Sequence, residues 1–155
     1  LIRTEADELT YALHVMVRYE IEKQMIAGTL AIKDVPAEWN RLYKEYLGVD
    51  VPSDSQGCLQ DSHWSGGSIG YFPSYALGSA YGPQILNAMQ KDIGDIYPDV
   101  EKGDLSRVTG WLREHIHQHA SFIKPGILFE RICGKFDAKY FTDYLTRKYS
   151  ELYNL

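Results

Sequence analysis

The sequence has few features of a β-sheet, a membrane span or a disulfide framework. No convincing strand pattern, internal repeat or low-complexity segment is present. No apolar run approaches the ~18 residues that a membrane span requires. The two cysteines, Cys58 and Cys133, lie far apart and form no metal-like pair, so we expect free thiols in a reducing cytosol. The sequence therefore predicts an all-α, cytoplasmic protein with no membrane partner.

Clustered positive charge is also lacking. The net charge is −5, and the chain has no grouped lysines and arginines of the kind that bind phosphate, which argues against a nucleic-acid partner. At 155 residues the chain suits one domain with a real core, or one region of a larger protein. It starts at Leu1 rather than at a methionine and shows no signal peptide, so we expect residues 1–155 to be one region of a longer protein.

Apolar periodicity and helix-ending residues predict helices along most of the chain. Proline is expected in the first turn of two of them, at Pro36 and Pro73. Gly48 is expected to end the helix that contains Pro36, and Gly134 is expected to end the helix at 127–133. Asp137 is expected to cap the last helix. The predicted helical segments are 2–27, 34–48, 73–91, 105–119, 127–133 and 137 onward, with a short helix or turn within 92–103.

The first and last helices are expected to be amphipathic. The first should pack through Leu9, Leu13, Met16, Val17 and Ile21. A second side is polar at helical spacing, so Arg3 and Asp7 are expected to pair on it, with a solvated face as the simpler interpretation. The last helix carries an aromatic seam that is expected to lie in the core: Tyr140, Phe141, Tyr144, Leu145, Tyr149 and Leu152.

Residues 57–82 concentrate polar chemistry among glycines. Residues 60–64 read QDSHW and combine an amide, a carboxylate, a hydroxyl, an imidazole and an indole. Tyr71, Tyr75 and Tyr81 follow, interspersed with glycines that allow close backbone approach. This composition is typical of a loop that faces a substrate. The alternative is a rigid loop whose His63 and Asp61 only satisfy buried backbone groups.

A complete set of catalytic groups is not recognisable. The run from His115 through His117 to His119 invites a metal interpretation, since the first and last would share a helical face. Ile116 stands where a zinc hydrolase would place its general base, so a helix surface is the default interpretation. No serine triad, thiol-protease pattern or phosphate loop is present. The remaining constellation of Arg3, His63, Tyr71 and Tyr75 can bind a carboxylate and stabilise an oxyanion, but it contains no nucleophile.

The residues resemble a known family, the thermostable metallocarboxypeptidases typified by carboxypeptidase Taq. Residues 2–7 read IRTEAD and match the pattern I-R-x-x-A-D in full. Residues 57–64 read GCLQDSHW and match G-x-x-Q-D-x-H-W in full. The order is that of the family, and the resemblance continues to about Tyr149.

The resemblance implies a largely helical, zincin-like fold with a deep cleft, usually in a homodimer. Such enzymes remove C-terminal residues from peptides by means of a divalent metal, zinc or cobalt. The family holds this metal with an H-E-x-x-H helix and a later glutamate, all upstream of the matched region and absent from this sequence. We therefore expect no metal ligand in residues 1–155 and no activity by them alone. The alternative is a non-catalytic helical module that binds peptide C-termini or a protein partner.

The resemblance also assigns roles at the substrate's terminal carboxylate. Arg3 resembles the arginine that grips this carboxylate, and Tyr75 resembles its tyrosine partner. Gln60 and Asp61 are grouped with them as substrate-binding residues that hold the loop.

Two further residues are expected near the reacting carbonyl. His63 resembles the motif histidine close to the scissile bond. Tyr71 is a second candidate for stabilising the oxyanion. Both are predicted as catalytic residues that assist an upstream metal centre.

Overall fold

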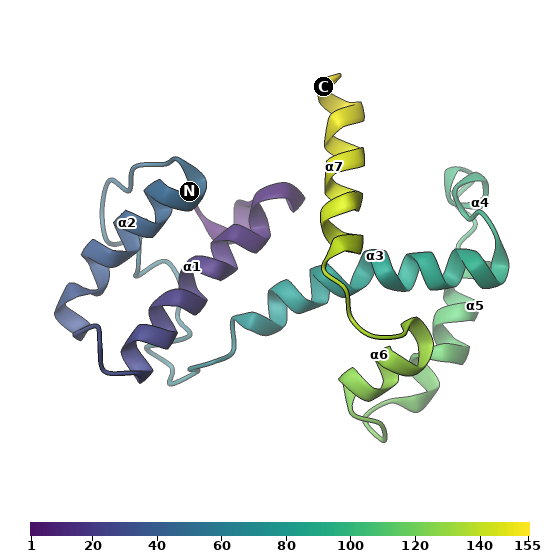
Figure 1. Ribbon diagram of the computed structural model, residues 1–155, viewed down its shortest axis with the longest axis horizontal. Coiled ribbons are helices and arrows are strands. Elements are labelled where there is room, and N and C mark those ends of the chain that lie inside the picture. The colour runs from purple at the N-terminus through teal and green to yellow at the C-terminus, as the bar shows by residue number, and fades with distance from the viewer. The chain divides into compact units, whose positions relative to one another are not determined.

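The computed structural model describes all of residues 1–155, and its regular structure is entirely helical (Figure 1). The all-α prediction is confirmed. The chain divides into two compact units, residues 1–79 and residues 80–155. Each unit is described separately below. That residues 1–155 act as one region of a longer protein stays a prediction.

The first unit is built on a pair of packed helices, α1 (Glu8–Ile26) and α2 (Val35–Leu47). A short 3-10 helix precedes each of them, η1 (Arg3–Glu5) before α1 and η2 (Ile32–Asp34) before α2. The loop that follows α2 runs alongside these two helices (Figure 1).

The residues predicted to start and end the helices of the first unit are largely confirmed. Pro36 lies in the first turn of α2, and Gly48 ends that helix in the left-handed conformation, with φ of 70°. Asp34 precedes α2, but its side chain makes no capping hydrogen bond. Residues 48–72 form turns and loop, and α3 (Pro73–Ile93) begins at the predicted proline.

The core of the first unit is aromatic and lies between α1, α2 and the loop. Trp39 stacks on Tyr43 with ring centroids 5.0 Å apart, and Trp64 from the loop meets Trp39 edge-on at 6.0 Å. Such offset and edge-on contacts add to the stabilisation from burial alone. The buried cluster consists of Val17, Ile21, Val35, Trp39, Leu42, Tyr43 and Cys58.

The predicted packing face of α1 is partly wrong. Leu9 and Met16, expected in the core, are 39% and 44% exposed. The buried face instead carries three polar residues, His14, Arg18 and Glu22, beside the predicted Val17 and Ile21. Each of the three has a hydrogen-bond partner, which is the condition for burying a polar group without a large penalty.

The predicted start of the first helix is also wrong. Asp7 is the N-cap of α1, because its carboxylate accepts hydrogen bonds from the backbone and hydroxyl of Thr10 at 2.8 and 2.7 Å. Arg3 lies before this cap, in η1, and pairs with Asp61 rather than with Asp7. The helix therefore begins six residues later than periodicity indicates.

The second unit contains most of α3 and four further helices. Its core gathers Met89, Ile96 and Trp111, with Val108, Leu112 and Ile116 among the residues packed against them. No helix of the protein is both long enough and apolar enough to cross a membrane. The four helices are α4 (Tyr97–Glu101), α5 (Ser106–His115), α6 (Pro125–Cys133) and α7 (Lys139–Tyr153).

The aromatic seam of α7 does not lie in the core of its unit. No residue of α7 is fully buried, and Leu152 is 62% exposed. The predicted cap at Asp137 is wrong by one position, because the N-cap of α7 is Ala138 and has no side-chain cap hydrogen bond, although the Asp137 carboxylate accepts the backbone N–H of Lys139 at 2.8 Å. The prediction of a core helix was wrong because periodicity identifies an apolar face but not what covers it.

Candidate functional site

The loop that carries residues 57–64 is held against α1 by a buried carboxylate. Glu22 Oε1 accepts the indole N–H of Trp64 at 2.9 Å and the backbone N–H of Gly70 at 3.1 Å. At the other end of the loop, a Cβ added to Gly57 would lie 2.8 Å from Val51 Cγ1 and 3.2 Å from the Ser53 carbonyl oxygen. Close approach of neighbouring atoms therefore explains the single glycine of the GCLQDSHW segment.

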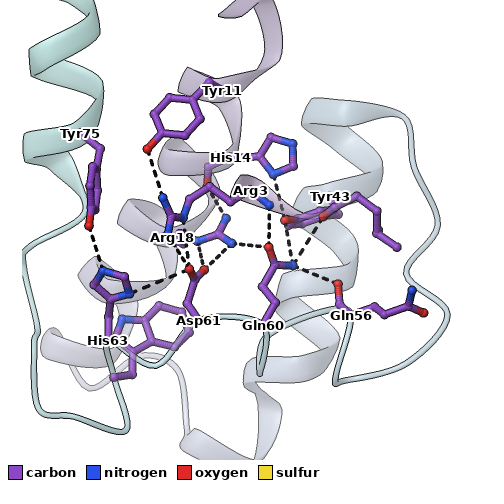
Figure 2. A network of polar contacts seen from close by, with 12 residues as sticks. Arg3, Tyr11, His14, Arg18, Tyr43, Gln56, Gln60, Asp61, His63 and Tyr75 are labelled. Carbon is purple, nitrogen blue, oxygen red and sulfur yellow. Dashed lines mark hydrogen bonds and ion pairs between the residues drawn. The ribbon is translucent and has the colours of Figure 1, made fainter. Parts of the chain in front are cut away.

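Gln60 connects the loop to three other elements. Its Oε1 accepts the backbone N–H of Arg3 at 2.9 Å and an N–H of Arg18 at 2.8 Å. Its Nε2 donates to the Gln56 carbonyl at 2.9 Å and to the Tyr43 hydroxyl at 3.3 Å. Both ends of the amide are thus engaged within the protein, as Figure 2 shows.

Asp61 is shared between two arginines. Its Oδ1 accepts Nε and Nη2 of Arg3 at 3.1 and 2.8 Å, and its Oδ2 accepts Nε of Arg18 at 2.7 Å (Figure 2). Burial alone would raise the pKa of Asp61, but the hydrogen bonds and positive charges of the two arginines hold this pKa below its usual value. The carboxylate is therefore ionised at neutral pH.

Arg18 is the residue of this site that sequence reasoning missed. It lies on α1 with 0% exposure, and its guanidinium stacks over the ring of Trp39 at 4.5 Å. Its Nη1 donates to the backbone carbonyl of His14 at 2.6 Å. The sequence offered one signal for Arg18: it directly follows Val17, among the apolar residues of the first helix. An arginine buried there needs an anionic partner, which would have pointed to a carboxylate elsewhere in the chain.

Arg3 keeps part of its donor capacity. An arginine side chain carries five N–H donors. Two of those of Arg3 go to Asp61 and a third, on Nη1, goes to the Tyr11 hydroxyl at 3.1 Å. One N–H therefore remains on each terminal nitrogen. The guanidinium lies 5.0 Å from the ring centroid of Tyr75, which helps to fix its plane, and Arg3 is 8% exposed.

The two arginines and one aspartate leave a surplus of positive charge. Arg3 and Arg18 both form ion pairs with Asp61, so this cluster holds two positive charges against one negative charge. Surplus charge combined with two N–H groups on the end of a guanidinium is what a carboxylate ligand requires.

His63 extends the site toward the aromatic residues. Its Nε2 lies 3.2 Å from the Tyr75 hydroxyl, and its Nδ1 lies 3.9 Å from Asp61 Oδ1 with no hydrogen-bond partner (Figure 2). Its ring packs on Phe72 at 4.4 Å and on Tyr71 at 5.8 Å. Tyr71 is 52% exposed, so part of its side chain is open to solvent.

The structure thus brings all six predicted site residues into one connected cluster within the first unit. They are Arg3, Gln60, Asp61, His63, Tyr71 and Tyr75. Besides Arg18, the cluster contains Tyr11 and the buried pair of His14 with Tyr43, whose Nδ1 and hydroxyl lie 3.0 Å apart. Burial first, and then the charge of Arg18, lower the pKa of His14 to about 4.

No group of three or more His, Cys, Asp and Glu side chains could hold a metal ion in residues 1–155. The predicted shared helical face of His115 and His119 is wrong, because α5 ends at His115 and the 3-10 helix η3 (His117–His119) follows. His115 instead stacks on Trp111 at 4.4 Å. His115 and His119 line one cavity of about 360 Å³ together with Asp92 and Arg131, but the Asp92 carboxylate accepts the Trp111 indole N–H at 2.8 Å and Arg131 disfavours a cation. The residues present therefore do not fit a metal centre.

Known proteins match this chain over nearly its full length. The family described as Carboxypeptidase Taq (M32) metallopeptidase matches residues 1–149. Carboxypeptidase 1 of Bacillus subtilis is 43% identical over 99% of this chain, and thermostable carboxypeptidase 1 of Thermus thermophilus is 40% identical over the same share. The chain spans only 31% and 30% of the length of these relatives.

Solved structures agree with the curated relatives. A carboxypeptidase of this family from Deinococcus radiodurans matches with a TM-score of 0.95 at 42% identity, over 99% of this chain and 31% of that one. The carboxypeptidase of Pyrococcus furiosus matches with a TM-score of 0.91 at 39% identity, over 96% of this chain and 30% of that one. The two sequence motifs and the helical structure agree with these matches. The chain belongs to the carboxypeptidase Taq family of metallopeptidases.

Proposed function

We propose that residues 1–155 form the substrate-binding part of a metal-dependent carboxypeptidase that removes C-terminal residues from peptides. The observation that carries this proposal is the unused hydrogen-bonding capacity of the Arg3 guanidinium. Its terminal nitrogens keep one N–H each, in a cluster with one positive charge more than negative charge. A peptide C-terminus offers two oxygens and one negative charge, which complements this arrangement.

In this proposal four members of the cluster each have one role. Arg3 binds the terminal carboxylate of the peptide, and Tyr75 contacts the same carboxylate beside it. His63 donates a hydrogen bond near the scissile carbonyl. Tyr71, which is 52% exposed, is the second donor for the oxyanion that forms there.

Gln60 and Asp61 serve substrate binding by holding Arg3. Both oxygens of Asp61 and the amide oxygen of Gln60 accept hydrogen bonds from arginine side chains or from the Arg3 backbone. Positioning groups of this kind raise affinity because the arginine is already ordered before the substrate arrives.

The divalent metal, zinc or cobalt, is proposed to be held by residues outside 1–155. This agrees with the lack of a metal-binding group within them and with the share of its relatives that the chain spans. Residues 1–155 would then hydrolyse no peptide by themselves. A homodimeric, cytoplasmic enzyme is proposed from the family resemblance alone.

The proposal is tested with the full-length carboxypeptidase that contains these residues. Replacing Arg3 with Ala should lower kcat/KM for a peptide by about 2–4 kcal/mol of transition-state binding, because a desolvated carboxylate loses its partner. The same peptide with a C-terminal amide should be hydrolysed poorly by the native enzyme, and Arg3→Ala should have little further effect on it.

The matched control is Arg41→Ala, which removes an exposed arginine of α2 that pairs only with Glu38 and Glu45. It should leave kcat/KM unchanged. If Arg3→Ala also leaves kcat/KM unchanged, Arg3 does not bind the carboxylate and the proposal fails.

A further inference from the structure

Arg18 is the most deeply buried charge of the site. Its side chain has 0% exposure, and its partners are Asp61 Oδ2 at 2.7 Å, Gln60 Oε1 at 2.8 Å and the His14 carbonyl. Its guanidinium is held between the rings of Trp39 at 4.5 Å and Phe72 at 5.4 Å. This geometry leaves it no surface for direct contact with a substrate.

Arg18 nevertheless shares both of its side-chain anchors with Arg3. Asp61 gives one carboxylate oxygen to each arginine, and Gln60 Oε1 accepts from the Arg18 side chain and from the Arg3 backbone. Loss of Arg18 would therefore remove one hydrogen-bond partner from each of these two groups that anchor Arg3.

The sharing also sets the charge that Arg3 presents. With Arg3 and Asp61 alone, the pair would be neutral, and Arg3 would have little attraction left for an anion. Arg18 adds one positive charge to the same carboxylate, and its own charge has no exposed surface. The surplus is consequently presented through Arg3, the arginine with surface left to meet a ligand.

We propose that Arg18 is a positioning residue that sets both the orientation and the effective charge of Arg3 through Asp61. This inference rests on the proposed role of Arg3 as the group that binds a peptide carboxylate. It adds a specific requirement: the carboxylate affinity of the site depends on a charge that never touches the ligand.

The test measures inhibition of the full-length carboxypeptidase by N-acetylphenylalanine, a simple carboxylate probe, at about 0.05 M and about 0.5 M NaCl. In Arg18→Gln, which keeps a donor for Asp61, the inhibition constant should rise on the order of tenfold at low salt and lose most of its salt dependence. The value of kcat should change little compared with KM. An unchanged inhibition constant in Arg18→Gln would overturn the inference.

A double variant separates charge from packing. Arg18→Gln combined with Asp61→Asn restores the net charge of the cluster to that of the native protein, so the salt dependence of probe binding should recover relative to Arg18→Gln alone. If Arg18 were only a structural residue, the double variant would keep the weak salt dependence of Arg18→Gln. That result would reject the proposal.

Two variants cover the case in which Arg18→Gln does not fold. Arg18→Lys keeps the charge and should keep the salt dependence. Asp61→Asn leaves Arg18 in place and raises the net charge of the cluster, so the salt dependence should become steeper, and a shallower one would contradict the inference. If Arg3→Ala does not weaken probe binding, the proposed function itself fails, whereas an effect of Arg3→Ala without an effect of Arg18→Gln removes only this inference.

Discussion

Trp64 donates its indole N–H to the buried carboxylate of Glu22, 42 residues earlier in the chain, at 2.9 Å. The same carboxylate oxygen accepts the backbone N–H of Gly70, so one side chain of α1 holds the loop on both sides of its glycine-rich turn. Trp64 is the last residue of the GCLQDSHW segment, and Glu22 is one helical turn beyond Arg18. The contact thus fixes the loop next to the arginine cluster.

Glu22→Ala should destabilise the protein by about 1–3 kcal/mol, since it leaves two donors of the loop without their acceptor. Unfolding in urea, followed by tryptophan fluorescence, measures the change. Glu20→Ala is the control, because Glu20 lies on the same helix but pairs only with Lys23 at the surface. Equal effects of the two substitutions would show that the Glu22 contacts contribute nothing specific.

Gly57 and Gly78 should respond oppositely to alanine. Gly57→Ala should destabilise by about 1–3 kcal/mol, because its new methyl group would meet Val51 and the Ser53 carbonyl. Gly78 lies within α3 with nothing near its missing Cβ, so Gly78→Ala should stabilise by about 0.5–1 kcal/mol through helix propensity. Thermal unfolding of the two variants measures both changes in stability. A Gly57→Ala protein as stable as the native one would show that the loop relaxes freely there.

Because of His14, the free energy of unfolding should fall in mild acid. Its pKa in the folded protein is lowered from 6.5 to about 4, so the unfolded chain binds the proton more tightly. The stabilisation is fully present above pH 6.5 and is lost as pH falls from about 6.5 to about 4, in total about 3 kcal/mol.

His14→Asn, which keeps a polar group beside the Tyr43 hydroxyl, should flatten the free energy of unfolding across this window. Urea unfolding at a series of pH values from 4 to 7 measures it. Asp61 does not interfere, since its pKa lies below its usual value and its loss of stability falls at lower pH. An unchanged pH slope in His14→Asn would assign the effect to another group.

Tyr75 and Tyr71 should affect different kinetic constants of the full-length enzyme. Tyr75→Phe should raise KM by about fivefold to thirtyfold, the cost of about one hydrogen bond to the bound carboxylate. Tyr71→Phe should lower kcat by about a hundredfold if its hydroxyl stabilises the oxyanion. Tyr19→Phe, at an exposed position of α1, is the control. Full activity in Tyr71→Phe would remove Tyr71 from the reaction.

Residues 1–155 by themselves should hydrolyse no peptide, with or without added Zn²⁺ or Co²⁺, while the full-length protein should be active with metal. The physical reason is the lack of any metal-binding group within these residues. Peptide hydrolysis by both proteins, side by side, measures this. Metal-dependent activity of residues 1–155 would direct attention to His115 and His119, which line the same cavity.

The amino-acid sequence by itself determined the helical class and several helix boundaries, and it singled out six of the residues that the structure brings together in one cluster. Pro36, Gly48, Pro73 and Gly134 act through their own backbone restrictions, which need no tertiary contact to be predicted. The polar residues of the loop were recognisable because their chemistry is dense along the chain.

Only the tertiary structure decided which face of α1 is buried and what holds Arg3. Periodicity assigned Leu9 and Met16 to the core, whereas the structure buries Arg18 and Glu22. The physical reason is that burying a charge is favourable only where its partners are already in place. Those partners, Asp61 with Gln60 for the arginine and the Trp64 indole for the glutamate, lie some forty residues away along the chain, beyond the reach of any local pattern.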